Sequence, residues 1–184
     1  MAFYTIGHST RSIQEFLELI REQGIKQLID VRTVPRSRTN PQFNRELLPE
    51  SLRAVGIEWE HAPALGGLRR PSPDSPNTAW RNANFRGYAD HMASREFERA
   101  LDHVIEVGRS ENVVLMCAEA VPWRCHRSLI ADALLARGFE VTEIIGRGQS
   151  RPHKMTSFAR VEDGRVSYPE PDACAPQGGK AWRG

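Results

Sequence analysis

The sequence has few cysteines and no long apolar run, and both absences narrow what the protein can be. Three cysteines in 184 residues is a low and odd count, which does not predict the disulfide framework of a small secreted domain. No apolar run approaches the ~20 residues that a membrane-spanning helix needs. Residues 3–6 lead into a predicted strand rather than a secretory signal. We therefore expect a cytoplasmic protein with no membrane partner.

The sequence also lacks an excess of charge of either sign. Its 25 lysines and arginines nearly balance 23 aspartates and glutamates, which gives a net charge of +2. So small a charge does not indicate nucleic-acid binding, and any anion site must come from local arginines. The length suits one domain. We expect a single α/β domain over residues 1–168 and a disordered tail over 169–184, which is rich in proline and glycine.

Strand and helix patterns alternate along the predicted domain. The predicted strands cover residues 3–6, 27–32, 57–61, 112–116 and 140–145. The predicted helices lie within 12–24, 49–55, 94–107 and 125–137. This alternation predicts a three-layer α/β sandwich around a mostly parallel five-stranded sheet, opened by a βαβ unit. Asp163-Gly164 predicts a C-terminal hairpin, and the aperiodic segment 62–86 is either a lid or poorly ordered.

Reactive side chains follow the predicted strands. They are His8, Ser9, Arg32, His61, Cys117, Glu119 and Arg147. In an open parallel sheet the carboxyl ends of the strands lie at one edge, where ligands bind. We therefore expect one cleft that holds a thiol, imidazoles and several arginines.

Cys117 carries the sharpest chemical prediction. It ends the apolar run 113–116, and Arg32, Arg127 and the start of a predicted helix near Cys125 are able to lower its pKa. A reactive thiolate is one interpretation. The other is a structural cysteine at the end of a core strand, because free cysteines are among the most buried residues. The surrounding arginines favour the nucleophile.

Cys125 leaves several roles open. It is able to resolve an oxidised Cys117 as a disulfide, to bind a metal together with Cys117 and His126, or simply to pack the start of a helix. The spacing of these residues matches no standard zinc signature. We therefore predict no metal and no cofactor, and keep the metal site as an alternative.

Positive side chains near Cys117 predict an anion site. His126 and Arg127 fall in the first turn of a predicted helix, where a cation opposes the helix dipole unless an anion is bound there. A solvated first turn is the plainer alternative. The full set predicted to bind an anion is Ser9, Arg32, Arg36, His126 and Arg127.

Two further side chains are candidates for moving protons. His8 follows a strand end and is able to act as a base, although it equally suits a capping role for the next helix. Glu119 is a general acid or base in one interpretation and the ion-pair partner of Arg127 in the other. Asp30 lies inside an apolar strand and is expected to be buried and paired with an arginine such as Arg32.

Several motifs together resemble a known family. They are Tyr4-Thr-Ile-Gly-His-Ser9, Asp30-Val-Arg32, Cys117-Ala-Glu119 and Cys125-His-Arg127. The combination resembles the domains of unknown function numbered 488 over about residues 3–155. The resemblance implies a small bacterial-type α/β protein with no agreed reaction.

A looser similarity is to rhodanese-like and cysteine-phosphatase domains. Leu28-Ile-Asp-Val-Arg32 and a cysteine at a strand end are similar to their active-site half. Those families place the cysteine closer to the arginine, whereas Cys117 and Arg127 stand ten positions apart and Pro122 lies between them. The similarity therefore implies a fold that is rhodanese-like in outline rather than a particular activity.

Three functional hypotheses follow. The first is a cysteine-dependent enzyme that acts on a small anionic substrate by sulfur, phosphoryl or acyl transfer, or by thiol redox chemistry. The second is a nucleic-acid-binding or processing module that uses the arginine-rich loops, with Trp59 or Trp80 stacking on a base. The third is a metal-dependent enzyme with cysteine and histidine ligands. The sequence leaves the substrate and the oligomeric state open.

Overall fold

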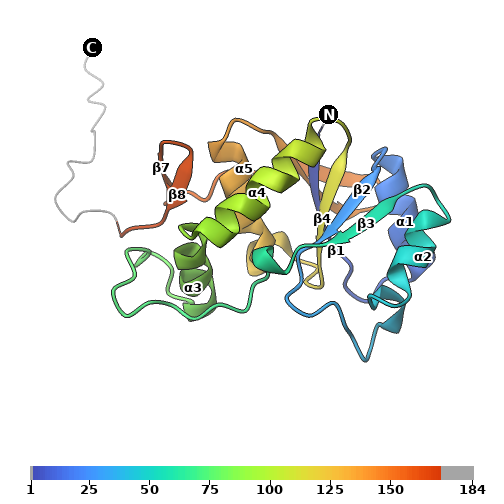
Figure 1. The fold of residues 1–184 in the computed structure, drawn as a ribbon, viewed down its shortest axis with the longest axis horizontal. Helices are drawn as coiled ribbons and strands as arrows, with labels where there is room; N and C mark the ends of the chain where they lie inside the picture. The colour runs from blue at the N-terminus through green and yellow to red at the C-terminus, as the bar shows by residue number, and fades with distance from the viewer. Residues whose placement is uncertain (1, 171–184) are drawn as a thin grey trace, which may run out of the picture.

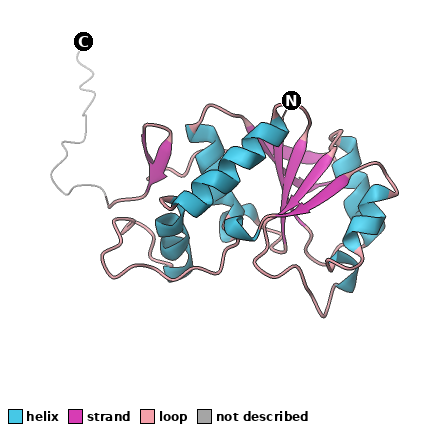
Figure 2. Cartoon of the chain, in the orientation of Figure 1, coloured by secondary structure: helices cyan, strands magenta, loops and turns pink. Residues whose placement is uncertain are grey.

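A computed structural model of the chain describes residues 2–170. Its centre is a six-stranded sheet in the order β3-β2-β4-β1-β5-β6 (Figures 1 and 2). The strands are β1 (Phe3–Gly7), β2 (Gln27–Asp30), β3 (Glu58–His61), β4 (Val113–Cys117), β5 (Val141–Gly146) and β6 (Gln149–Pro152). Strands β1 to β5 are parallel and β6 is antiparallel to β5. The predicted α/β class and mostly parallel sheet are confirmed.

Helices cover both faces of the sheet. The helices are α1 (Ile13–Glu22), α2 (Leu48–Arg53), α3 (Ala83–Met92), α4 (Arg95–Gly108) and α5 (Arg127–Ala136), with short 3₁₀ turns η1 (Pro41–Phe43), η2 (Pro63–Leu65) and η3 (Pro122–Arg124). Alternate residues of a strand point to opposite faces. In β4, Val114 and Met116 pack with α1 and α2, while Leu115 and Cys117 pack with α3, α4 and α5. The three predicted layers are therefore present.

Local sequence signals set the helix boundaries. The Ser12 side chain accepts a hydrogen bond from the Glu15 amide at 3.2 Å, and the Ser94 side chain accepts one from the Phe97 amide at 3.2 Å. These N-caps begin α1 and α4 where the sequence predicts them. Gly24 follows α1 with a φ of +63°, a left-handed conformation that favours glycine after a helix.

Long-range features of the sheet differ from the prediction. Strand β4 lies between β1 and β2, so the strands of the opening βαβ unit do not pair directly. A sixth strand, β6, adds to the five that were predicted; its residues are exposed and carry no apolar alternation, which is why the pattern missed it. Pro152 ends this strand at the sheet edge, where proline is tolerated.

Segment 62–86 is part of the packed structure rather than a poorly ordered loop. The Arg69 guanidinium donates to the Gly66 and Ala64 carbonyls, and the Asn77 side chain donates to Asp90 at 2.8 Å. Helix α3, which begins within this segment at Ala83, was not predicted. Its low apolar content and its internal Gly87 hide the helical periodicity.

The predicted C-terminal hairpin is present. It consists of β7 (Arg160–Glu162) and β8 (Arg165–Ser167), joined by Asp163 and Gly164 with φ values of +50° and +74°. Positive φ at both turn residues is the type I′ pattern expected for Asp-Gly. The predicted disordered tail, 169–184, lies outside the described residues from 171 onward. Among the described residues, no helix has the length and apolar character to span a membrane.

The order of the connections creates a switch point in the sheet. The chain runs from β1 through α1 to β2 on one face, and from β4 through α5 to β5 on the other. Strands β1 and β4 are neighbours, so their outgoing connections diverge to opposite faces. Such a divergence opens a crevice at the carboxyl ends of the two strands.

Candidate functional site

A pocket of about 470 Å³ lies at this switch point. Several segments form its wall, including the loops after β1, β2 and β4, the 62–86 segment and the start of α3. The predicted site residues that line it are His8, Arg32, Arg36, Cys117, Glu119, Cys125 and His126. Three others, Ser9, Asp30 and Arg127, lie outside the lining. The structure thus gathers most of the predicted cleft into one pocket.

The ends of β1 and β4 approach closely beneath the pocket. Gly7 pairs with Cys117, and the His8 and Ser9 amides donate to the carbonyls of Cys117 and Ala118, each at 2.9 Å. A Cβ at Gly7 would lie 1.8 Å from the Glu119 carbonyl oxygen. Glycine is therefore required at Gly7 for the loop after Cys117 to take its place.

The Cys117 sulfur lies within 4.8 Å of both the Cys125 sulfur and a ring nitrogen of His126. Cys117 and Cys125 are 8% and 4% exposed. A hydrogen bond from the Cys125 thiol lowers the pKa of Cys117 well below its ordinary value, against the effect of burial, and His126 and the Glu119 amide act in the same direction. The same bond raises the pKa of Cys125. Within this pair the thiolate is therefore favoured on Cys117 and the proton on Cys125.

His126 is held with one ring nitrogen toward the two thiols. Its Nε2 lies 3.1 Å from the Val31 carbonyl oxygen, which can only accept, so Nε2 carries a proton. Its Nδ1 lies 3.8 Å from the Cys125 sulfur. Gly67 and the ring of Tyr88 pack against the imidazole. Nδ1 therefore faces the thiols and lies within hydrogen-bond distance of the Cys125 sulfur.

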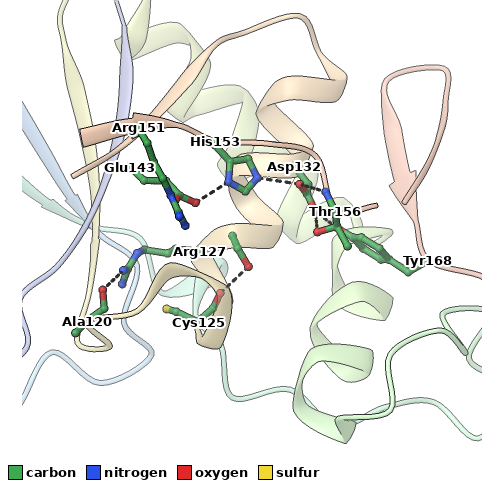
Figure 3. Close-up of polar contacts among 10 residues, drawn as sticks. Ala120, Cys125, Arg127, Asp132, Glu143, Arg151, His153, Thr156 and Tyr168 are labelled. Carbon is green, nitrogen blue, oxygen red and sulfur yellow. Dashed lines mark hydrogen bonds and ion pairs between the residues drawn. The ribbon is translucent and has the colours of Figure 1, made fainter. Parts of the chain in front are cut away.

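Arg127 lies beneath the pocket instead of lining it. Its side chain is fully buried and donates to the carbonyl oxygens of Glu119 and, at 3.0 Å, Ala120 (Figure 3). No carboxylate of the described residues pairs with it. A buried cation without a carboxylate favours negative charge nearby, and the Arg127 charge opposes the rise in the pKa of Cys125 that the Cys117 hydrogen bond causes.

This placement differs from the anion cradle expected of Arg127. The guanidinium is occupied in holding the loop after Cys117, and the Ser128 amide donates to the Cys125 carbonyl at 3.0 Å. Helix α5 begins at Arg127, two residues later than predicted. The first turn therefore offers less to an anion than the sequence suggested, and Glu119 binds Arg127 through its backbone oxygen rather than its carboxylate.

Asp30 and Arg32 form a buried ion pair. Asp30 is 0% and Arg32 5% exposed. The Arg32 Nε donates to Asp30 at 2.8 Å, and Nη2 donates to Asp30 and, at 2.7 Å, to the Phe43 carbonyl. Nη1 bonds to His8 at 3.2 Å. One N–H of Arg32, the second on Nη1, has no partner among the described residues and can bind a ligand in the pocket.

His8 supports Arg32 with both ring nitrogens engaged. A guanidinium only donates, so the His8 Nε2 accepts from Arg32 and Nδ1 donates to the Ser9 carbonyl at 2.8 Å. Burial lowers the pKa of His8, and the Arg32 charge adds to this effect. His8 is therefore neutral and has no free lone pair, which suits positioning Arg32 better than the proton transfer that the sequence suggested.

Several residues of the site were missed from the sequence. Gly67 and Tyr88 hold His126, and Asn82, Asn84 and Phe85 complete the pocket wall. The Gly66-Gly67 pair was the only available signal, because paired glycines mark a close backbone approach. His153, which the sequence did not mark as a site residue, is buried between Asp132 and Glu143 (Figure 3).

Comparison with known proteins gives one positive result. The family described as Domain of unknown function DUF488 matches residues 12–134. The match includes Arg32, Cys117, Cys125 and His126 and ends within α5. Searches of curated proteins and of solved structures found no match.

Proposed function

Because the chain belongs to the DUF488 family, whose description names no activity, we propose a function from the site itself: a thiol-dependent enzyme. Cys117 is the nucleophile, and it attacks a sulfur–sulfur bond in a small anionic substrate. The observation that supports the proposal best is that the Cys125 sulfur and a His126 ring nitrogen lie within 4.8 Å of the Cys117 sulfur, an arrangement that lowers the pKa of Cys117. A thiolate is the reactive form of cysteine.

The charges around the pocket support an anionic substrate. Arg32, Arg36 and Arg124 line it, and Arg36 and Arg124 are exposed. Arg32 is fixed by Asp30 and His8 and keeps one N–H for a ligand. A preorganised guanidinium binds oxyanions strongly. Glu119 also lines the pocket and is exposed, so an anion would bind on the arginine side.

The second thiol favours sulfur chemistry over phosphoryl transfer. Attack by the Cys117 thiolate on an S–S bond joins Cys117 to one sulfur and releases the other as a thiolate, which takes the Cys125 proton. The Cys125 thiolate then attacks the Cys117 sulfur, forms a Cys117–Cys125 disulfide and releases the second sulfur as a thiolate, which takes a proton from solvent. An external thiol reduces the disulfide before the next turnover. Arg127, the arginine that follows the two cysteines in the sequence, is occupied by the carbonyls of Glu119 and Ala120 and is not available to a phosphoryl group.

Alkylation kinetics test this proposal. We expect iodoacetamide to label Cys117 near neutral pH at least about tenfold faster than an ordinary thiol such as a cysteine peptide. The labelling rate of Cys117 should change little as the pH rises toward the pKa of the peptide thiol. In Cys125→Ser, the serine hydroxyl should form a weaker hydrogen bond to the Cys117 sulfur, so the apparent pKa of Cys117 should rise. Mass spectrometry shows which cysteine carries the label. Labelling of Cys117 no faster than the peptide would contradict the proposal.

A metal site is the second candidate function. The sulfurs of Cys117 and Cys125 and a ring nitrogen of His126 all lie within 4.8 Å of one another. Zinc accepts such a ligand set and, in catalytic sites, keeps a fourth position open to substrate. The bond from His126 Nε2 to the Val31 carbonyl is typical of a metal-binding histidine. Elemental analysis of protein purified without chelator tests it: stoichiometric metal that is lost in Cys125→Ser supports this candidate over the free thiolate.

A further inference from the structure

A chain of alternating charges, most of them buried, runs from Asp132 in α5 through His153 and Glu143 to Arg151 at the surface (Figure 3). The His153 Nε2 donates to Asp132 at 2.9 Å, and its Nδ1 donates to Glu143 at 2.8 Å. Glu143 in turn accepts from the Arg151 Nε at 2.7 Å. Although burial opposes it, the bonds to Asp132 and Glu143 raise the pKa of His153 to about 9. His153 is therefore a cation at neutral pH.

Asp132 anchors the inner end of this chain. Its carboxylate also accepts hydrogen bonds from the Thr156 hydroxyl at 2.6 Å and the Tyr168 hydroxyl at 2.9 Å. Asp132 is 0% exposed and Glu143 4% exposed. The two carboxylates are thus neutralised by His153 and Arg151 and held in fixed positions. Such a buried network fixes the orientation of the group at its outer end.

Arg151 is that outer group, and most of its donors are free. Its guanidinium carbon lies 5.0 Å from the centre of the Trp123 ring, while its Nε is bound to Glu143. Among the described residues, its Nη1 and Nη2 have no hydrogen-bond partner. The Arg151 side chain is 49% exposed and Trp123 is 62% exposed. The protein therefore presents a fixed guanidinium edge beside an exposed aromatic ring.

A pocket of about 680 Å³ surrounds these two side chains. Lys154 lines it and is exposed, which leaves this region with an excess of positive charge over the paired carboxylates. Trp80, stacked on Phe85, gives an apolar wall. The turn η3 divides this pocket from the cysteine pocket, because Trp123 lines the one and Arg124 the other.

We propose that this second pocket binds an oxyanion that is joined to a planar aromatic ring, the chemistry of a nucleotide. Arg151 and Lys154 bind the oxyanion, and the exposed ring of Trp123 stacks on the aromatic ring. Arginine and lysine recognise phosphate through charge-assisted hydrogen bonds, and tryptophan stacks on any base. The site does not depend on the reactivity of Cys117, so it goes beyond the proposed function.

Calorimetric titration of the full chain tests the proposal with AMP, ribose 5-phosphate, adenosine and a single-stranded oligonucleotide of about ten nucleotides. We expect AMP to bind at least about tenfold more tightly than ribose 5-phosphate or adenosine, because each lacks one of the two recognised groups. Binding should weaken as salt rises. Binding of the oligonucleotide in place of AMP would support the same chemistry and assign the phosphate to a nucleic acid.

Variants assign the binding to the pocket. Arg151→Gln and Trp123→Leu should each weaken binding at least about tenfold. Arg109→Gln is the matched control, since Arg109 is an exposed arginine that pairs with one glutamate, Glu106, as Arg151 pairs with Glu143. Cooperative thermal unfolding well above the assay temperature and an unchanged Cys117 alkylation rate in all three variants exclude a folding defect. Equal affinity in Arg151→Gln and Arg109→Gln, or no binding of either AMP or the oligonucleotide, would overturn the proposal.

Discussion

At the scale of single residues, the site depends on how its histidines and arginines are supported. Arg32 and Arg127 are both buried, yet Arg32 is paired with Asp30 while Arg127 binds backbone carbonyls. The first is therefore oriented toward the pocket, and the second supports negative charge beneath it. The two histidines also differ in role. His8 has both ring nitrogens bonded and positions Arg32, whereas His126 keeps one ring nitrogen toward the thiols.

The clearest residue-scale prediction concerns Gly67. A Cβ there would lie 2.3 Å from the His126 Nδ1, so Gly67→Ala must displace the imidazole from the thiols. We expect alkylation of Cys117 near neutral pH to slow by about tenfold or more, because His126 is one of the groups that lower the pKa of Cys117, and a higher pKa leaves less of the reactive thiolate. Gly146→Ala is the control, since its nearest contact is 3.7 Å away. Unchanged alkylation in Gly67→Ala would show that His126 does not assist Cys117.

At the scale of elements, the buried charges bind β6 and α5 to β5. His153 follows β6, Glu143 lies in β5 and Asp132 lies in α5. An edge strand of exposed residues, such as β6, gains little from apolar burial. The polar network therefore attaches β6 to α5, through the bond between His153 and Asp132.

This attachment predicts a pH dependence of stability. The pKa of His153 is raised from 6.5 to about 9 in the folded protein, so its contribution is full below pH 6.5 and is lost as the pH rises through 9. The pKa of Glu143 is lowered from 4.5, mainly by His153 and Arg151 against the effect of burial. Its contribution is therefore present above pH 4.5 and is lost at lower pH.

Urea unfolding at about pH 6 and about pH 9.5 measures the effect. We expect the free energy of unfolding to fall by about 2–3 kcal/mol between them in the wild type. The fall should be smaller in His153→Gln, which cannot titrate. His103→Gln is the control, because His103 is an exposed histidine that pairs with Glu60. An equal fall in wild type and His153→Gln would place the pH dependence elsewhere.

Prediction from the sequence succeeded for local features and failed for remote ones. The helix starts at Ser12 and Ser94 and the Asp163-Gly164 turn depend on neighbouring residues, and each lies at the predicted position. The contacts of His153 join residues that are 10 and 21 positions apart, and their charges gave no period to detect. Burial of His153 follows from the packing of β6 against α5, which the sequence did not predict.

At the scale of the whole molecule, the strand order explains why the cysteine pocket exists. The strand ends could be predicted, since each apolar run stops at a polar residue, and this was enough to gather Cys117, Arg32 and His8 at one edge. The place of β4 between β1 and β2 could not be predicted, because it depends on which strands pair across distant parts of the chain. That pairing is what sets Gly7 beside Cys117.

A ligand at this switch point should stabilise the entire domain. It would contact the loops after β1, β2 and β4, so it binds the folded chain alone, and such binding raises the unfolding temperature. We expect sulfate to raise it more than chloride at equal ionic strength. The difference should shrink in the double variant Arg36→Gln, Arg124→Gln, whose side chains are exposed in the pocket.

Arg165→Gln with Arg109→Gln is the matched control, because both are exposed, ion-paired arginines outside the pocket. It removes the same charge from the molecule. A general salt effect would therefore act equally on the two double variants, whereas a bound anion would lose its effect only in the first. If sulfate stabilises both variants to the same extent, the arginines of the cysteine pocket do not form an anion site, and the substrate of Cys117 need not be anionic.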